Sequence, residues 1–204
     1  MTATKQARNK AIGEMKRSLI LDAAKTVFKR DGLEGGSLRA IAKEAGYTTA
    51  ALYSYFDSKE SIYANLLRIS LENLKEHIDA SLLEELNLQA IIYKNAKSFY
   101  QFYANNPQDL ELGFYLFKGG IQPEGVGVER NKELNDALLL TLQPIITSCV
   151  SLGKKIIEAK AIAAEILALI SGVLLLHFTH RIKIFDVNPE ELFETHIQRV
   201  LDKL

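Results

Sequence analysis

The 204-residue sequence has one cysteine, four prolines and no tryptophan, and its formal net charge is zero. The single cysteine, Cys149, excludes an internal disulfide and is compatible with a reducing compartment, so we expect a cytoplasmic protein. No apolar run near residue 1 is long enough for a signal peptide. The longest apolar stretch, residues 166–176, is shorter than the about 20 residues that cross a bilayer, which predicts a buried helix or an interface and no membrane partner.

The sequence also lacks the motifs on which most enzyme classes depend. It has no nucleophile elbow, no paired His-Glu metal motif and no glycine loop that precedes a helix and cradles phosphate. His177 and His180 are three residues apart, but no nearby Asp, Glu or Cys completes a metal-binding set. We therefore expect no enzymatic activity, no metal and no cofactor.

Residues 37–59 contain two short amphipathic patterns on either side of Gly46. The first has apolar residues at helical spacing after Ser37, which suits an N-cap: Leu38, Ile41, Ala42 and Ala45. A glycine accepts the left-handed backbone that ends a helix and turns the chain. The second pattern, after Thr48, places Leu52 and Phe56 on one face and leaves Ala50, Tyr53 and Ser54 on the other. This arrangement predicts a helix-turn-helix whose second helix fits a DNA major groove.

The charges are distributed unevenly along the chain. Residues 1–60 hold eleven Lys or Arg and seven Asp or Glu, whereas the remainder holds fourteen and eighteen. The basic end is therefore the helix-turn-helix end, as expected for a protein that contacts phosphates. Residues 5–17 hold five basic residues and one acidic residue. They are interpreted either as a flexible arm that reaches phosphates or a minor groove, or as a solvated tail that contacts nothing.

Helical periodicity continues to the end of the chain, and no strand signal of comparable length appears. Beside the two helices above, helices are expected at 14–30, 58–83, 88–105, 108–118, 129–152 with an interruption at Pro144, 159–185 and 189–204. The predicted fold class is all-α, with about nine helices. We expect a basic arm and a three-helix, homeodomain-like DNA-binding domain at 1–60. A helical effector-binding and dimerisation domain is expected at 61–204.

The first quarter of the chain resembles the DNA-binding domain of the tetracycline-repressor (TetR) family of bacterial regulators. The residues that carry the resemblance are Ile20, Ala23, Ala24, Phe28, Gly32, 37–42, Gly46, 52–56 and 58–60. It implies phosphate contacts from Ser37, Thr48, the Ala51 backbone, Tyr53, Tyr55 and Lys59. It implies base contacts from Arg39, Thr49 and Ala50. Alternatively, Arg39 forms a surface ion pair with Glu44 or Asp57, and Tyr55 lies close to the core face of its helix.

The rest of the chain resembles the family in length and helical character, which implies a ligand-binding domain. Aromatic residues flank Pro107, and such a concentration suits a pocket for an apolar or aromatic effector. The candidate pocket residues are Phe99, Phe102, Tyr103, Phe114, Phe117 and His177. The alternative is that these aromatic side chains form the core of the domain.

The last two expected helices carry apolar stripes and the small residues Ser171 and Gly172, which permit close approach of helices. Two such pairs would form a four-helix bundle across a twofold axis, which predicts a homodimer. The candidate interface residues are Ile166, Ile170, Val173, Leu174, Phe193, Ile197, Val200 and Leu201. The alternative is burial against the chain's own helices.

These features predict a ligand-responsive transcriptional regulator, a repressor that binds a pseudopalindromic DNA operator as a homodimer. A small-molecule effector, which the sequence does not identify, would release or rearrange it. Two other classes fit the helical pattern. One is a small-molecule-binding protein or enzyme with a vestigial helix-turn-helix head, and the other is a protein-interaction or architectural module.

Overall fold

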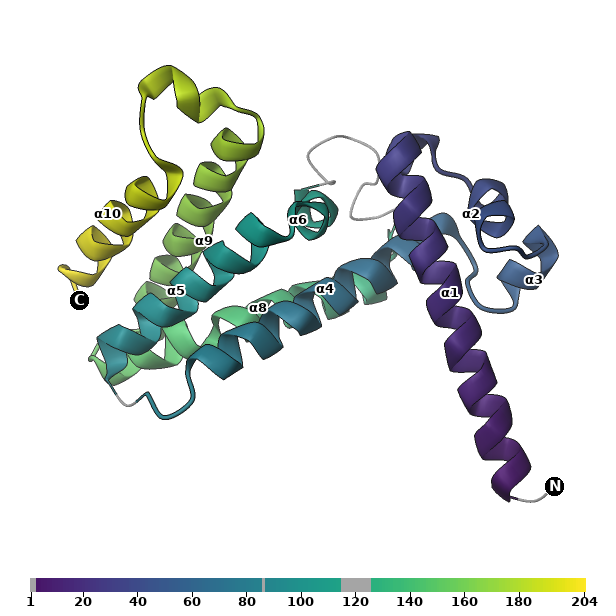
Figure 1. Ribbon diagram of the computed structural model, residues 1–204. Coiled ribbons are helices and arrows are strands. Elements are labelled where there is room, and N and C mark those ends of the chain that lie inside the picture. Colours follow the sequence, from purple (N-terminus) through teal and green to yellow (C-terminus); the bar gives the residue numbers. More distant parts are fainter. Residues whose placement is uncertain (1–2, 86, 115–125) are drawn as a thin grey trace. The chain divides into compact units, whose positions relative to one another are not determined.

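In a computed structural model, the described residues are 3–85, 87–114 and 126–204, and their regular secondary structure is entirely helical (Figure 1). The predicted all-α fold class is confirmed. The chain divides into two compact units, residues 1–69 with 111–134 and residues 70–110 with 135–204. Helix α4 (Lys59–Ser81) starts in the first unit and ends in the second, so the division falls within this helix.

The first unit is built around α1 (Ala3–Gly35), α2 (Leu38–Glu44) and α3 (Thr49–Tyr53). Their apolar faces and that of α4 meet in one core, which includes Ile20, Ala24, Val27, Ile41, Leu52, Phe56 and Ile62. The stripes predicted from the sequence are the buried faces of these helices. Gly46 has a φ of 72°, so the turn between α2 and α3 uses the left-handed backbone expected of it.

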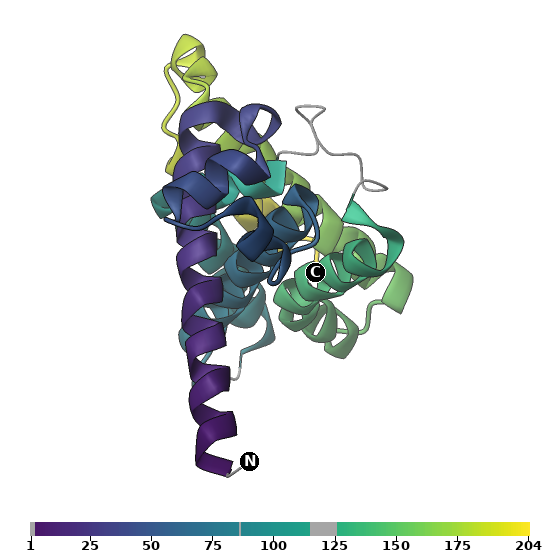
Figure 2. The ribbon, with the colours of Figure 1, turned by 90° about the vertical axis from the view of Figure 1, so that its right-hand side faces the viewer.

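The start of α1 differs from the expectation. Residues 5–17, predicted to be a flexible arm or a solvated tail, are a continuous part of α1 and extend beyond α2 and α3 (Figures 1 and 2). An i,i+4 pair between Lys10 and Glu14, with 3.9 Å between Nζ and Oε1, lies on this extension. The helix is interrupted at Gly32, whose φ of 69° lies in the left-handed region.

Arg17 of α1 connects three parts of the first unit. Its guanidinium donates to the Tyr55 carbonyl at 3.0 Å and to Asn65 Oδ1 at 2.8 Å. The same group lies 4.3 Å from the centre of the Phe56 ring. One side chain therefore connects the end of the helix-turn-helix to the first turns of α4.

Two later stretches of the chain complete the first unit. Tyr63 Oη donates to the Leu112 carbonyl at 2.6 Å, in α6 (Pro107–Phe114). Arg130, in the first turn of α8 (Val128–Ser151), lies 2.6 Å from the Asp57 carboxylate. Parts of α6 and α8 thus contact the DNA-binding head. Of the helix expected at 108–118 and the loop expected at 121–128, residues 115–125 lie outside the described residues.

The second unit contains α5 (Leu88–Asn105), α9 (Ile156–Phe178), the short 3-10 helix η2 (Arg181–Phe185) and α10 (Pro189–Leu201), with parts of α4 and α8. Helix α9 packs against α5 and α10. The helix expected to continue to residue 185 ends at Phe178, and His180 then turns the chain with a φ of 57°. Helix α8 remains helical through Pro144.

All eight side chains predicted for a dimer interface lie in the core of this unit instead. Their exposed fractions range from 0% to 8%, and Phe193 stacks on Tyr100 with 4.7 Å between ring centres. For these eight residues the structure therefore shows burial against the chain's own helices. Helix α9 is 23 residues long, so the argument that its apolar stretch is too short to span a membrane no longer holds. Helix α9 packs against α5 and α10, as a core helix of this unit does.

We expect Arg17→Met to destabilise the first unit by about 1–3 kcal/mol, because two hydrogen-bond acceptors lose a charged donor. Arg17→Lys should recover only part of this loss, since an ammonium group cannot fork to two acceptors in the way a guanidinium does. Thermal unfolding of the three proteins would measure the effect. Equal melting temperatures for all three would show that the Arg17 contacts contribute nothing to stability.

Candidate nucleic-acid interface

The two helices of the helix-turn-helix are capped by hydroxyl side chains. Ser37 Oγ accepts a hydrogen bond from the Ala40 amide at 3.1 Å, and Thr48 Oγ1 accepts one from the Ala51 amide at 3.2 Å. These bonds use lone pairs of the hydroxyls, so each O–H remains able to donate to another acceptor. Both caps are exposed, and each therefore presents a donor beside a helix N-terminus, where anions are favoured.

Helix α3 presents a short outward face. Leu52 is fully buried, whereas Ala50, Tyr53 and Ser54 are exposed and Thr49 is half-buried. Tyr53 is 58% exposed, which is high for an aromatic side chain of this size. The face is small and hydroxylic around one aromatic ring, which agrees with the side-chain directions inferred from helical spacing.

Arg39 is exposed on α2, and its two suggested surface partners are engaged elsewhere. Glu44 accepts from Arg30 at 3.2 Å, and Asp57 pairs with Arg130 at 2.6 Å. The Arg130 guanidinium also lowers the pKa of the Asp57 carboxyl, chiefly through this hydrogen bond. Within the described part of the chain, Arg39 has no hydrogen bond or ion pair, so its guanidinium points to solvent as a base-reading side chain would.

The remaining candidate residues are more constrained. Tyr55 is half-buried against the core of the first unit, and its carbonyl accepts from Arg17. Lys59, the first residue of α4, donates to the Glu34 carbonyl at 3.4 Å. The Ala51 amide, which the resemblance assigns to a phosphate, already donates to Thr48. For these three residues a phosphate contact would have to share or replace a bond within the protein.

The four candidate pocket residues whose side chains the structure describes lie on two helices of the second unit. Phe99 and Tyr103 are buried on α5, with 5.3 Å between ring centres, and Phe102 is half-buried at 5.2 Å from Tyr103. Burial raises the pKa of the Tyr103 phenol to about 12, so the side chain stays neutral. His177 is half-buried on α9 against Phe178. The Phe114 side chain and Phe117 lie outside the described residues.

Three contributing residues were missed from the sequence. Arg17 and Arg130 hold the head together across separations of 38 to 73 residues, and helical periodicity carries no signal for such pairs. Asn95, fully buried on α5, donates to the Thr141 carbonyl at 3.0 Å, while its Oδ1 has no hydrogen-bond partner among the described residues. A polar residue in the apolar stripe of α5 was the available signal for Asn95.

The sequence model of the "Bacterial regulatory proteins, tetR family" matches residues 20–66, which contain the helix-turn-helix and its core. The transcriptional repressor KstR2 of Rhodococcus jostii is 36% identical over 81 residues, 38% of this chain and 40% of that protein. The alignments to this and two other curated relatives span 36% to 57% of the relatives' lengths.

Solved structures resemble the chain over most of its length. The regulatory protein SCO4313 has a TM-score of 0.75 at 20% identity, covering 95% of this chain and 98% of that one. The transcriptional regulator FadR from Bacillus subtilis, solved in complex with stearoyl-CoA, has a TM-score of 0.68 at 17% identity, covering 92% and 98%. These likenesses show a shared fold. Residues 20–66, which contain the helix-turn-helix, therefore form an amino-terminal domain of the tetR family of bacterial regulatory proteins.

Proposed function

We propose that this chain is a homodimeric transcriptional repressor that binds a pseudopalindromic DNA operator and responds to a small-molecule effector. The observation that carries the proposal is the helix-turn-helix within residues 20–66, whose outward face is exposed. The description of the relative KstR2 as a transcriptional repressor supports the sign of regulation. The absence of any recognised catalytic motif in the sequence is consistent with a binding protein.

In this proposal the capping residues and Tyr53 contact phosphates and position the protein on the DNA, and Arg39 distinguishes the bases. The Ser37 and Thr48 hydroxyls and the Tyr53 phenol would donate to phosphates, with Lys59, Tyr55 and the Ala51 backbone nearby. Arg39 would fork onto a guanine, while Thr49 and Ala50 would contact a thymine methyl group. The outward face of α3 has no amide or guanidinium side chain, so the direct reading of bases falls mainly to Arg39.

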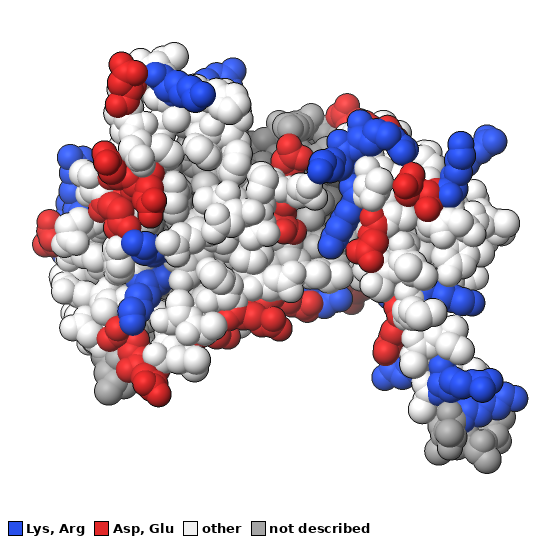
Figure 3. All heavy atoms as spheres, in the orientation of Figure 1, with Lys and Arg blue, Asp and Glu red and all other residues white. Residues whose placement is uncertain are grey.

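The helical extension of α1 would add phosphate contacts beside the operator. Lys5, Arg8 and Lys10 are exposed, and blue side chains gather at this end of the helix in Figure 3. Because the extension is helical, it would contact DNA as a rod with spaced cations rather than as a chain threaded into a groove. Each phosphate neutralised would make binding more sensitive to salt.

A stripe along the outer side of α9 supports the homodimer. Exposed residues of small or apolar type recur at helical spacing: Ile157, Ala161, Ala164, Ala168, Gly172 and Leu175. Within the chain, only 28% of the most apolar window of α9 is buried. A second copy packed on this stripe would remove it from water, and its small residues would allow the two helices to approach closely. The proposed interface therefore lies on the side of α9 opposite its four buried candidate residues, Ile166, Ile170, Val173 and Leu174.

The interior of the second unit would hold the effector. Asn95 Oδ1 is a buried acceptor with no partner among the described residues, and Phe99 and Tyr103 follow it on the same face of α5. An unpaired buried acceptor is costly, so a ligand that donates one hydrogen bond while contacting aromatic rings would be favoured there. The solved complex of FadR with stearoyl-CoA supports a ligand-binding role for this fold.

Helix α4 would transmit the response. It begins beside the helix-turn-helix at Lys59 and continues into the second unit, so a ligand that favours another tilt of α4 would change the spacing of the two recognition helices. Those helices must sit about 34–36 Å apart, or a multiple of this, to enter successive major grooves. The ligand acts only through different affinities for the two arrangements. Equal operator binding with and without effector would contradict this part of the proposal.

Footprinting on genomic DNA tests the proposal as a whole. We expect a compact protected region with twofold symmetry and half-sites one or more helical turns apart, because two recognition helices bind together. Protection without symmetry would favour an architectural protein. No binding at low salt would favour a ligand-binding protein with a vestigial head.

Tyr53→Phe and Arg39→Ala test the division of roles at the DNA. Tyr53→Phe removes a phosphate donor and should weaken binding by about 1 kcal/mol on matched and mismatched operators alike. Arg39→Ala should also lose about 1–3 kcal/mol of preference at one base pair. Titration of both variants against the operator and its single-base changes would measure this. If each variant loses affinity equally on all operators, Arg39 is not a base-reading residue.

Ala168→Arg tests the proposed dimer face. A long cation in the middle of the α9 stripe should leave the protein folded but monomeric at micromolar concentration, because a like charge would meet it across the twofold axis. Ala80→Arg, on an exposed face of α4, is the matched control and should remain dimeric. Sedimentation equilibrium would give the masses. A wild-type monomer would reject the homodimer itself.

A further inference from the structure

The turn between α9 and α10 holds large apolar side chains in solvent. Ile184 is 76% exposed and Phe185 is 62% exposed, whereas the neighbouring Ile182 is buried and fixes the turn to the unit. His180 and Asp186, which flank η2, adopt φ values of 57° and 51°. This left-handed backbone is unfavourable for residues with a Cβ, and such strain gathers at functional contacts. We call residues 180–187 the η2 tip.

The η2 tip is also cationic. Arg181 and Lys183 are both exposed, and neither lies within ion-pair distance of an acidic side chain among the described residues. Asp186 is the single acidic residue of the segment. Two cations beside two exposed apolar side chains form a surface that matches an apolar site with negative charge at its edge.

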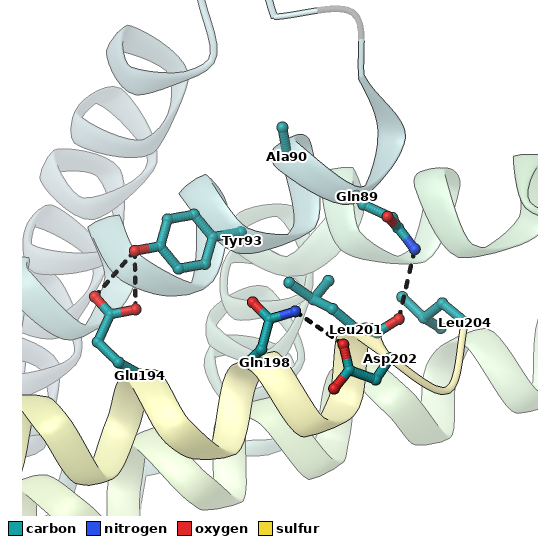
Figure 4. Close-up of a pocket in the computed structure, with 8 residues that line it drawn as sticks. All are labelled: Gln89, Ala90, Tyr93, Glu194, Gln198, Leu201, Asp202 and Leu204. Carbon is teal, nitrogen blue, oxygen red and sulfur yellow. Dashed lines mark hydrogen bonds between the residues drawn. The ribbon is translucent and has the colours of Figure 1, made fainter.

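A groove that combines polar, acidic and apolar side chains lies at the other end of α10. A groove of about 460 Å³ runs between α5 and α10 (Figure 4). Its lining residues are Gln89, Ala90, Tyr93, Glu194, Gln198, Leu201, Asp202 and Leu204. Leu201 is only 7% exposed, so the apolar surface of the groove comes chiefly from the half-buried Leu204 and Ala90. The charged side chains of its lining are Glu194 and Asp202. We call this the α5–α10 groove.

The two carboxylates of the groove differ in their partners. Glu194 accepts from Tyr93 Oη at 2.8 Å and from Lys97 Nζ at 2.8 Å, so its charge is already balanced. Asp202 accepts from the Gln198 amide at 2.9 Å and forms no ion pair within the described residues, although Lys154 donates to the carbonyl of the next residue, Lys203, at 3.0 Å. Asp202 also follows the C-terminal end of α10, where the helix dipole favours positive charge. The groove therefore has an open position for a cation at Asp202.

The tip and the groove of one chain cannot meet, since the 13 residues of α10 separate them by about 20 Å. A twofold axis perpendicular to α10 reverses the helix and brings the tip of one copy to the groove of the other. With the axis beside the exposed Thr195, Glu191 would face the partner's Arg199, which carries the opposite charge. Both residues are exposed and lie four positions from Thr195.

We propose that the η2 tip of each copy docks into the α5–α10 groove of a second copy of this chain. Ile184 and Phe185 pack against the partner's Leu204 and the partner's Ala90, and a tip cation lies beside the partner's Asp202. The contact is made twice because the axis repeats it. The docking rests on the homodimer of the proposed function. It specifies how the two copies of α10 are aligned along their length.

Disulfide trapping tests this contact in the full-length protein. The double variant Phe185→Cys with Leu204→Cys should form a covalent dimer under mild oxidation, because cysteines about 20 Å apart in one chain cannot bond to each other. The single variants and the wild type, whose Cys149 is buried, should remain largely uncrosslinked. A protein that sediments as a dimer yet gives no covalent dimer overturns the docking and leaves the proposed function intact. A monomer overturns both.

Charge reversal provides a second measurement. Asp202→Lys and Lys183→Glu should each raise the dimer dissociation constant about tenfold, and the combined variant should restore most of the affinity. Lys25→Glu, on an exposed face of α1, is the control and should leave the constant unchanged. If the two single losses simply add in the combined variant, Lys183 does not face the partner's Asp202. That result would overturn the pairing of Lys183 with Asp202, whereas an uncrosslinked dimer would overturn the docking itself.

Discussion

The hydrogen bonds of Arg17 are the constraint on which the DNA-binding surface depends. Helix α3 has five residues, far fewer than an isolated helix needs to persist in water. Its position is therefore set by tertiary contacts: Leu52 in the core, Thr48 at its start and the Arg17 guanidinium on the carbonyl of Tyr55. Recognition of DNA requires side chains held in place by packing, and here a cation on α1 fixes the chain just after α3, the proposed recognition helix.

Much of this head follows from local signals in the sequence. The apolar stripes, the caps at Ser37 and Thr48, and the turn at Gly46 each involve residues within about one helical turn, where spacing determines geometry. The acceptors of Arg17 lie 38 and 48 residues away, and no periodicity encodes such a pair. The helical start of α1 was also missed, because a run of charges is equally compatible with a disordered arm and an exposed helix.

The second unit shows a different limit of sequence reasoning. Apolar spacing on α9 predicted burial correctly, but it could not say which surface would cover each side chain. Ile166 and Ile170 are fully buried within their own chain, where α9 packs against α5 and α10, while Ala164 and Ala168 are exposed to water. A helix that is apolar on both sides needs two partners. Helix α10 is apolar on one side only, and its outward residues are polar, so the two helices would contribute differently to an interface.

Helices α4 and α8 each contribute residues to both compact units. The head is consequently not one continuous segment of the sequence. A chimaera that exchanged residues 1–69 alone would bring in a new helix-turn-helix but retain Leu112 and Arg130 from the recipient, the partners of Tyr63 and Asp57. Recombination between relatives would therefore succeed most often when both segments of the head are exchanged together. The part of the gene that determines DNA specificity would then consist of two separate segments.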